Sequence, residues 1–368
     1  MEVKIDTGYS WLICFSSFWI RVICVGLAMA YGVLMPSIKA HFDCSTVMVA
    51  SIGSLHLAVM FLFSVPFSLM TEYFGLQKAT IFGSLLATVS LIASAYSPIW
   101  QIFLVSYGLF AGFGLGMATF TSELCPSLFF EKWLSVANAI VFSGSSIGYL
   151  AFAPILSWVL ENYGLKMAFL LEAGLTVTAA IAGGLIISQP FAHNQNTDNQ
   201  MTKQKVVSDM KKVLTNRRFL THITGYAFAH LVLSNPVLFL PSMLTEQGLT
   251  LQEASLAITI IGISNTVGRL LCGLQDLCPQ HTIKTLAMAA LGSGLCMAFM
   301  VPFRGMSLTN TVCGFYGLLS GPIMSLIHAA KLQLLDKEQL STAIGISETI
   351  TGITFLAGWY LYGLGIWK

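Results

Sequence analysis

Apolar residues occur along this chain in long blocks, each close to the length needed to cross a lipid bilayer. A helix rises about 1.5 Å per residue, so a hydrocarbon core about 30 Å thick requires about 20 apolar residues. The first block has no small-residue cleavage site, so we interpret it as a membrane helix rather than a signal peptide. The sequence predicts spans at 11–35, 47–70, 79–96, 100–122, 134–159, 167–188, 220–243, 254–275, 285–303, 310–332 and 342–364.

One long hydrophilic segment interrupts this pattern and divides six spans from five. We expect an N-terminal six-helix half at residues 1–188, a cytosolic linker loop at 189–219, and a C-terminal half with five helices at 220–368. Apolar residues at helical spacing within the linker, beside several lysines, indicate either a short amphipathic helix on the inner leaflet or a solvated connection. A two-half organisation of this kind is typical of secondary transporters.

Composition excludes most soluble proteins. Only 9% of the 368 residues are charged, 55% are hydrophobic, and the mean hydropathy is +0.77, whereas soluble domains carry about 25% charged residues. The predicted fold class is therefore an all-α polytopic membrane protein. The net charge of +2 and the absence of a dense basic block argue against nucleic-acid binding.

Motifs for chemistry are missing from the sequence. The eight cysteines form no CxxC pair, and there is no Walker motif, no HExxH and no arguable Ser/His/Asp set. We therefore expect no metal site, no cofactor and no enzymatic activity, and we favour secondary or facilitated transport over ATP-driven pumping.

Lysine and arginine predict the orientation. With a cytosolic N terminus, twelve of them, including Lys331, lie in inner segments and four in outer segments. Because inner loops carry the excess of basic residues, the N terminus is expected in the cytosol.

Charged and amide side chains inside the spans are the candidate site residues, because they are costly in hydrocarbon. Arg269 lies deep in the eighth span, and Asn265 lies one turn earlier on the same face. A fixed cation and an amide on one face suit a substrate carboxylate. The alternative is that Arg269 pairs with a carboxylate on another helix, for example Glu348.

Two further charges lie within spans. Arg21 either lines the cavity or extends its side chain toward the cytosolic face. Glu348, six residues into the eleventh span, is a candidate proton site or the counter-ion of Arg269 or Arg21. A helix-end glutamate exposed to the cytosol is the equally fair alternative.

Several motifs resemble those of a known family. Asp6, Gly8 and Trp11 match the Asp-Gly-Gly-x-Gly-Trp signature that precedes the first span of monocarboxylate transporters, a branch of the major facilitator superfamily. Gly144 and Gly148 resemble the pattern of the family's fifth span. Further echoes, in the family's order, are at residues 31–33, 72–78, 163–166, 265–269 and 343–359.

The resemblance implies a twelve-helix-type facilitator bundle, here with about eleven helices and without the family's last one. It implies alternating-access transport of a monocarboxylate or related small organic anion, possible co-transport of a proton, residence in the plasma membrane, and association with a single-span accessory membrane protein. A transport-inactive binding or regulatory relative is the alternative.

Two departures concern the proton. Met29 and Asn265 stand where proton-coupled relatives carry lysine and aspartate, and neither side chain titrates near neutral pH. Arg269 stands at the position of the family's carboxylate-binding arginine. His328 aligns with a tenth-span aromatic residue that tunes substrate choice, so the resemblance makes it a candidate substrate-binding or proton site.

Overall fold

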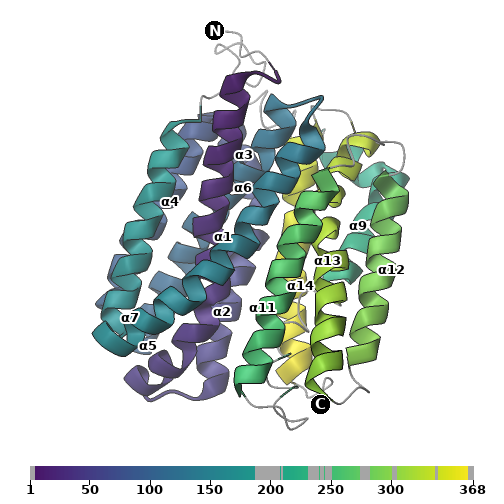
Figure 1. The fold of residues 1–368 in the computed structure, drawn as a ribbon. Coiled ribbons are helices and arrows are strands. Elements are labelled where there is room, and N and C mark those ends of the chain that lie inside the picture. The colour runs from purple at the N-terminus through teal and green to yellow at the C-terminus, as the bar shows by residue number, and fades with distance from the viewer. Residues whose placement is uncertain are drawn as a thin grey trace.

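The computed structural model is a bundle of helices, and no strand occurs among the residues that it describes (Figure 1). The described residues are 5–186, 208, 210–230, 240, 244, 251–273, 282–300, 305–335 and 339–363. The predicted all-α membrane fold is therefore confirmed. Most of the expected linker and the later part of the seventh predicted span lie outside the described residues.

The first half of the chain forms one group of helices, drawn from purple to teal in Figure 1. In order they are α1 (Gly8–Phe42), α2 (Thr46–Leu62), α3 (Ser64–Phe74), α4 (Leu76–Ala95), α5 (Trp100–Phe103), the π-helical η1 (Leu104–Ala111), α6 (Gly112–Phe129) and α7 (Leu134–Gly184).

The second half forms the neighbouring group, drawn from green to yellow, except α9, which is teal. Its described helices are α9 (Arg217–Ala229), α11 (Leu251–Cys272), α12 (Thr282–Met300), α13 (Met306–Leu334) and α14 (Leu340–Gly363). By length and composition, six described helices can cross a membrane, or seven if the bent pair α2 and α3 is one span. Two shorter apolar helices lie within α11 and α12.

Two predicted span boundaries look different in the structure. The second predicted span is a broken one, because α2 and α3 meet at Phe63 with a bend of 47°. The fifth and sixth predicted spans form the single element α7, interrupted at Gly164, whose φ of 78° leaves the helical region. Glycine reaches positive φ without steric cost, so the chain reverses there between two helical arms.

The N-terminal signature has a structural explanation. Thr7 and Ser10 form a capping box at the start of α1. The carboxylate of Asp6 accepts a hydrogen bond of 3.0 Å from the backbone N–H of Lys132, and the Asp6 N–H donates to the carbonyl of Phe129. These bonds attach the beginning of α1 to the connection between α6 and α7.

Glycines on α7 allow α1 to pack closely against it. A methyl group at Gly144 or Gly148 would overlap the backbone carbonyl oxygens of Phe18 and Val22, respectively. The same arrangement joins α13 to α11, where Gly321 lies against the backbone of Asn265. Small residues at four-residue spacing permit such backbone contacts inside a bilayer.

The two halves touch along two seams, one between α7 and α11 and one between α14 and the α2–α3 pair. Between α3 and α14, the hydroxyls of Ser68 and Ser341 share a hydrogen bond of 2.7 Å. Further along α14, the rings of Phe61 and Phe355 stack at 5.8 Å. Of the polar side chains singled out in the sequence, Asn265 and Arg269 make hydrogen bonds across the seam between α7 and α11.

Candidate functional site

Arg269 lies on α11 and reaches across the seam to α7. Its Nη1 donates to the carbonyl oxygen of Phe142 and to the Ser145 hydroxyl at 2.6 Å. Its Nε is buried without a hydrogen-bond partner. Both acceptors are neutral, so no carboxylate balances the guanidinium charge in these contacts. The alternative pairing of Arg269 with Glu348 is not the arrangement found here.

Asn265 lies one turn before Arg269 and connects three helices. Its Oδ1 accepts a hydrogen bond of 3.0 Å from Ser146 on α7, and its Nδ2 donates to Ser320 on α13 at 3.1 Å. Asn265 and Arg269 therefore face the same neighbouring helix, as their four-residue spacing predicted.

Arg21 is buried on α1, with 7% of its surface exposed. Its Nη1 donates to Glu123 Oε1 on α6 at 2.6 Å, and its guanidinium lies 3.9 Å from the centre of the Phe142 ring. The interpretation that Arg21 extends toward the cytosolic face is wrong, because Glu123 and Phe142 hold its side chain inside the bundle. Phe142 therefore contacts both arginines: Arg21 lies over its ring, and Arg269 donates to its backbone carbonyl.

Glu123 was missed in the sequence because the fourth predicted span ended at residue 122. The structure continues this helix through Glu123 to Phe129, with Glu123 only 2% exposed. Glu172, within the sixth predicted span, was also missed. For Glu123 the reason is that an apolar block followed by a carboxylate is usually the end of a span. Only a partner elsewhere in the chain changes that interpretation.

Glu348 is buried on α14, with 4% of its surface exposed. The interpretation of Glu348 as an exposed helix-end residue is therefore wrong. Its Oε1 accepts a hydrogen bond of 3.1 Å from Tyr226 on α9 and lies 4.0 Å from Lys331 Nζ on α13. Lys331 has no exposed surface, so counting it among the cytosolic lysines was also wrong.

His328 belongs to α13, but its side chain lies outside the described residues. Within the described part of the chain, no group of three or more His, Cys, Asp or Glu side chains is placed to hold a metal ion.

The charges at the seam do not balance. Arg21 pairs with Glu123 within the first half, and Lys331 pairs with Glu348 within the second. Glu123 also interacts electrostatically with Lys331 and Glu348 across the seam. We call these charged side chains and Arg269 the central cluster. Among its described members, three cations (Arg21, Lys331 and Arg269) face two carboxylates (Glu123 and Glu348), so the positive charge of Arg269 is not balanced. A site with one excess positive charge and hydroxyl and amide neighbours suits a small anion.

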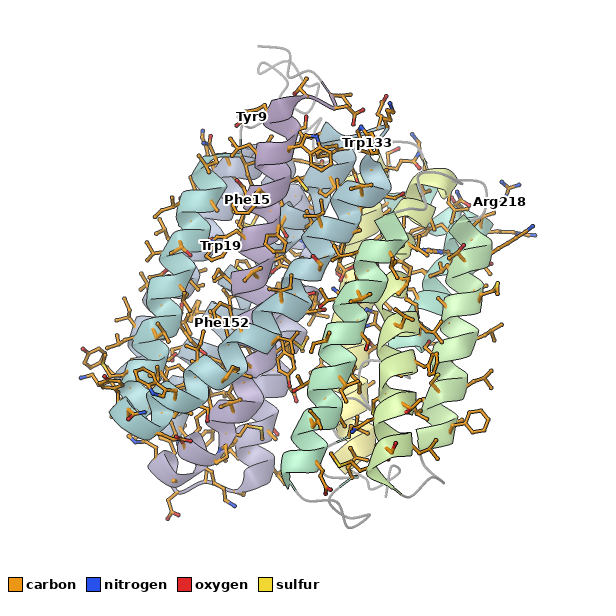
Figure 2. The ribbon with its side chains drawn as sticks, viewed as in Figure 1. Tyr9, Phe15, Trp19, Trp133, Phe152 and Arg218 are labelled. Atoms are coloured by element: carbon orange, nitrogen blue, oxygen red, sulfur yellow. The ribbon has the colours of Figure 1, made fainter. Side chains whose placement is uncertain are left out.

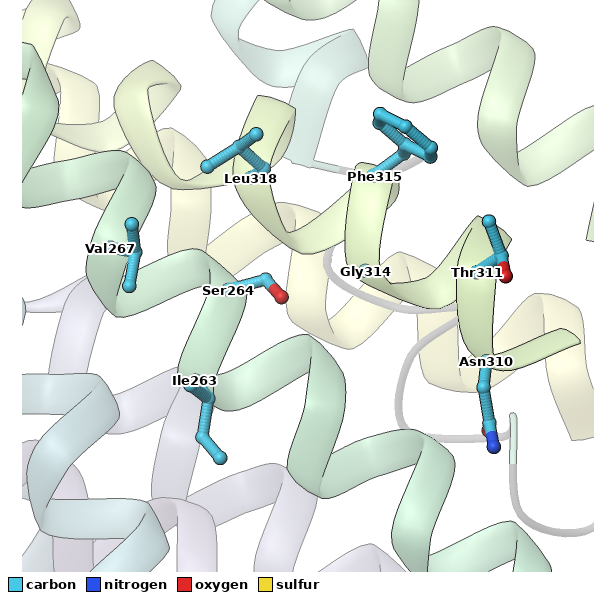
Figure 3. Close-up of a pocket in the computed structure, with 8 residues that line it drawn as sticks. All are labelled: Ile263, Ser264, Val267, Asn310, Thr311, Gly314, Phe315 and Leu318. Atoms are coloured by element: carbon cyan, nitrogen blue, oxygen red, sulfur yellow. The ribbon is translucent and has the colours of Figure 1, made fainter. Parts of the chain in front are cut away.

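A groove of about 330 Å³ between α11 and α13 is separate from this cluster (Figure 3). Ile263 and Val267 line it, and each is two residues from Asn265 along the chain. Two residues along a helix correspond to a rotation of about 200°, so both side chains lie on the side of α11 opposite Asn265. These two side chains and Phe315 are about half exposed. The groove is therefore at the periphery of the bundle rather than at Arg269.

Comparison with known proteins identifies the family of this bundle. The sequence model of the Major Facilitator Superfamily matches residues 14–358. The chain belongs to this superfamily. As a Major Facilitator Superfamily member, it is an integral multi-pass membrane transporter and not an enzyme.

Relatives within the superfamily confirm the resemblance seen in the sequence motifs. The chain is 25% identical over 361 residues to Monocarboxylate transporter 13 of Rattus norvegicus, covering 97% of this chain and 82% of the relative. It is 23% identical over 379 residues to Monocarboxylate transporter 2 of Mus musculus, covering 96% and 77%.

A solved structure has the same superfamily fold. The crystal structure of the human organic anion transporter MFSD10 (TETRAN) matches with a TM-score of 0.73 at 13% identity, covering 96% of this chain and 92% of that one. At this identity the match shows the fold alone.

Proposed function

We propose that this superfamily member is a secondary or facilitative transporter of a monocarboxylate or a related small organic anion. The observation that carries the proposal is Arg269, a cation on the seam whose contacts are a carbonyl and a hydroxyl. A carboxylate is a stronger partner for guanidinium than either, since it carries the opposite charge and can accept two parallel N–H···O bonds from the guanidinium. Asn265, with its hydroxyl neighbours, would orient the same anion.

Arg21 has a second role in this proposal. Its charge is already paired with Glu123, and its guanidinium covers the Phe142 ring. Arg21 would therefore contribute to substrate binding by fixing Phe142 and the positive field beside it. Arg269 would supply the direct contact.

The proposed mechanism is alternating access, in which residues 1–188 rock against residues 220–368 around the cluster. The two ion pairs support this division, because each joins helices of one half. Arg269 and the Ser68–Ser341 hydrogen bond join different halves. Movement would break these contacts between the halves and preserve the ion pairs within each half.

We also propose a plasma-membrane location with a cytosolic N terminus. Arg218 lies at the end of the bundle where the chain begins, as Figure 2 shows, and basic residues favour the cytosolic side. Antibody access to an N-terminal epitope tag in intact and permeabilised cells would test the orientation; labelling of intact cells would refute it.

The test of the transport proposal is uptake of labelled lactate, pyruvate, creatine, carnitine and aromatic amino acids in oocytes. Arg269→Ala should reduce uptake of the transported anion to background while surface biotinylation stays normal. Arg218→Ala removes an exposed cation and should leave uptake unchanged. Normal uptake by Arg269→Ala would refute the assignment of the anion contact.

A further inference from the structure

A second buried polar cluster lies within the first half, apart from Arg269. It contains Tyr31 on α1, His56 on α2, Tyr107 on η1 and Glu172 on the second arm of α7. The Tyr107 ring stacks on His56 at 4.5 Å and on Tyr31 at 5.3 Å. Glu172 lies within electrostatic range of the phenol groups of Tyr31 and Tyr107.

Glu172 is buried without a compensating charge. It is 1% exposed, its Oε1 has no hydrogen-bond partner, and it makes no ion pair with any described residue. Ionised carboxylates are costly in the membrane interior and are normally paired there, as Glu123 and Glu348 are. The negative charge of Glu172 is therefore removed only when the carboxylate binds a proton or another cation.

The neighbouring helices offer no such cation among the described residues. From α1, the hydroxyl of Tyr31 donates to the carbonyl of Val49 at 2.7 Å. From α2, His56 Nδ1 lies 2.8 Å from the carbonyl of Tyr107, while its Nε2 is buried without a partner. From α4, the contact with this arm of α7 is made by the hydroxyls of Thr88 and Thr176.

The local backbone is also unusual. Tyr107 lies in η1, a π-helical stretch, and such stretches are frequent at functional sites. Glu172 is seven residues after Leu165, about 10 Å along the helical arm that starts there. The carboxylate is therefore inside the bundle rather than at its rim.

We propose that Glu172 is a proton-binding site, which takes up a proton from water and returns it to water as the transporter cycles. A proton suits this cluster better than a metal cation, because no described group of three or more ligating side chains surrounds it. The site is distinct from the positions of Met29 and Asn265 in the two departures described above. Its coupling to anion movement rests on the proposed function, whereas proton binding itself does not.

The direct test is infrared spectroscopy of the purified full chain in lipid nanodiscs. The wild type should show a carboxylic acid C=O band that disappears as pH is raised, and Glu172→Gln should lack it. Glu161→Gln, which changes an exposed glutamate of α7, should retain the band. If Glu172→Gln does not fold, Glu172→Asp should shift the band instead. Absence of any band that depends on Glu172 would overturn the proposal.

A second test concerns coupling, in proteoliposomes with a transported anion. A gradient of one pH unit supports about ten-fold accumulation at one proton per anion. Glu172→Gln should lose this accumulation but retain exchange of labelled for unlabelled anion, while Glu161→Gln should accumulate like the wild type. Accumulation by Glu172→Gln at the wild-type level would refute coupling through Glu172. Failure of the wild type to exchange any anion would refute the proposed function, and the infrared band would still decide proton binding.

Discussion

Removing Arg21 should destabilise the protein strongly, because Glu123 would then be a buried carboxylate without a partner. The side chains of the pair are 8% and 2% exposed, and their charged atoms are 2.6 Å apart. Breaking a buried ion pair of this kind costs about 3–5 kcal/mol. At about 2–4 °C per kcal/mol for a large domain, Arg21→Met should lower the melting temperature by roughly 6–20 °C.

The double variant distinguishes a lost pair from lost packing. Replacement of a complete buried ion pair by uncharged residues is often neutral or even stabilising. We therefore expect Arg21→Met combined with Glu123→Gln to recover most of the stability, even though the contact of Arg21 with the Phe142 ring is lost. The exposed Arg218→Met is the control and should change stability by less than about 0.5 kcal/mol.

The measurement is thermal unfolding in detergent with a thiol-reactive fluorescent dye. Cys14, Cys24 and Cys125 are free and buried in the first half, so their labelling reports the loss of that bundle. A double variant that is as unstable as the sum of the two single variants would refute the reasoning. It would mean that Arg21 acts through shape rather than through the charge of Glu123.

Two further predictions concern packing and movement. Gly148→Ala should lower the free energy of unfolding by about 1–3 kcal/mol, because the added methyl group overpacks against Val22. The control is Gly174→Ala, whose methyl group meets no atom within 4 Å and should be neutral or slightly stabilising in the same melting assay. Equal effects of the two variants would contradict this account of the α1–α7 contact. The double variant Ser68→Cys with Ser341→Cys should form a disulfide between the halves. This disulfide should abolish uptake until a reducing agent is added. Full uptake by the oxidised protein would argue against rocking of the halves.

The fold could be predicted largely from the sequence, because bilayer thickness alone fixes the length of apolar blocks. Its boundaries could not. The first span was expected at 11–35 and the helix runs over Gly8–Phe42, and α6 extends past the expected end at 122. A hydropathy pattern treats each polar residue as a boundary, whereas a helix continues wherever its polar side chains find partners.

The site was predictable only where both residues lie on one helix. Asn265 and Arg269 were placed on one face by their spacing. The partner of Arg21 is 102 residues away in the sequence, and Lys331 was assigned to the cytosol although it is buried beside Glu348. Pairings across the bundle depend on helix packing, which periodicity within a single segment does not encode.

The arrangement of charges suggests why anion binding and movement of the halves would be linked. The carbonyl of Phe142 already accepts a hydrogen bond of 2.8 Å from Ser145, so Arg269 shares an occupied acceptor. A substrate carboxylate would offer Arg269 a better partner and weaken its attachment to α7. The free energy of binding would then be coupled to separation of the seam, because a ligand shifts a conformational equilibrium only through its differential affinity for the two states. The ion pairs Arg21–Glu123 and Lys331–Glu348 would keep each half intact during that step, since neither crosses the seam.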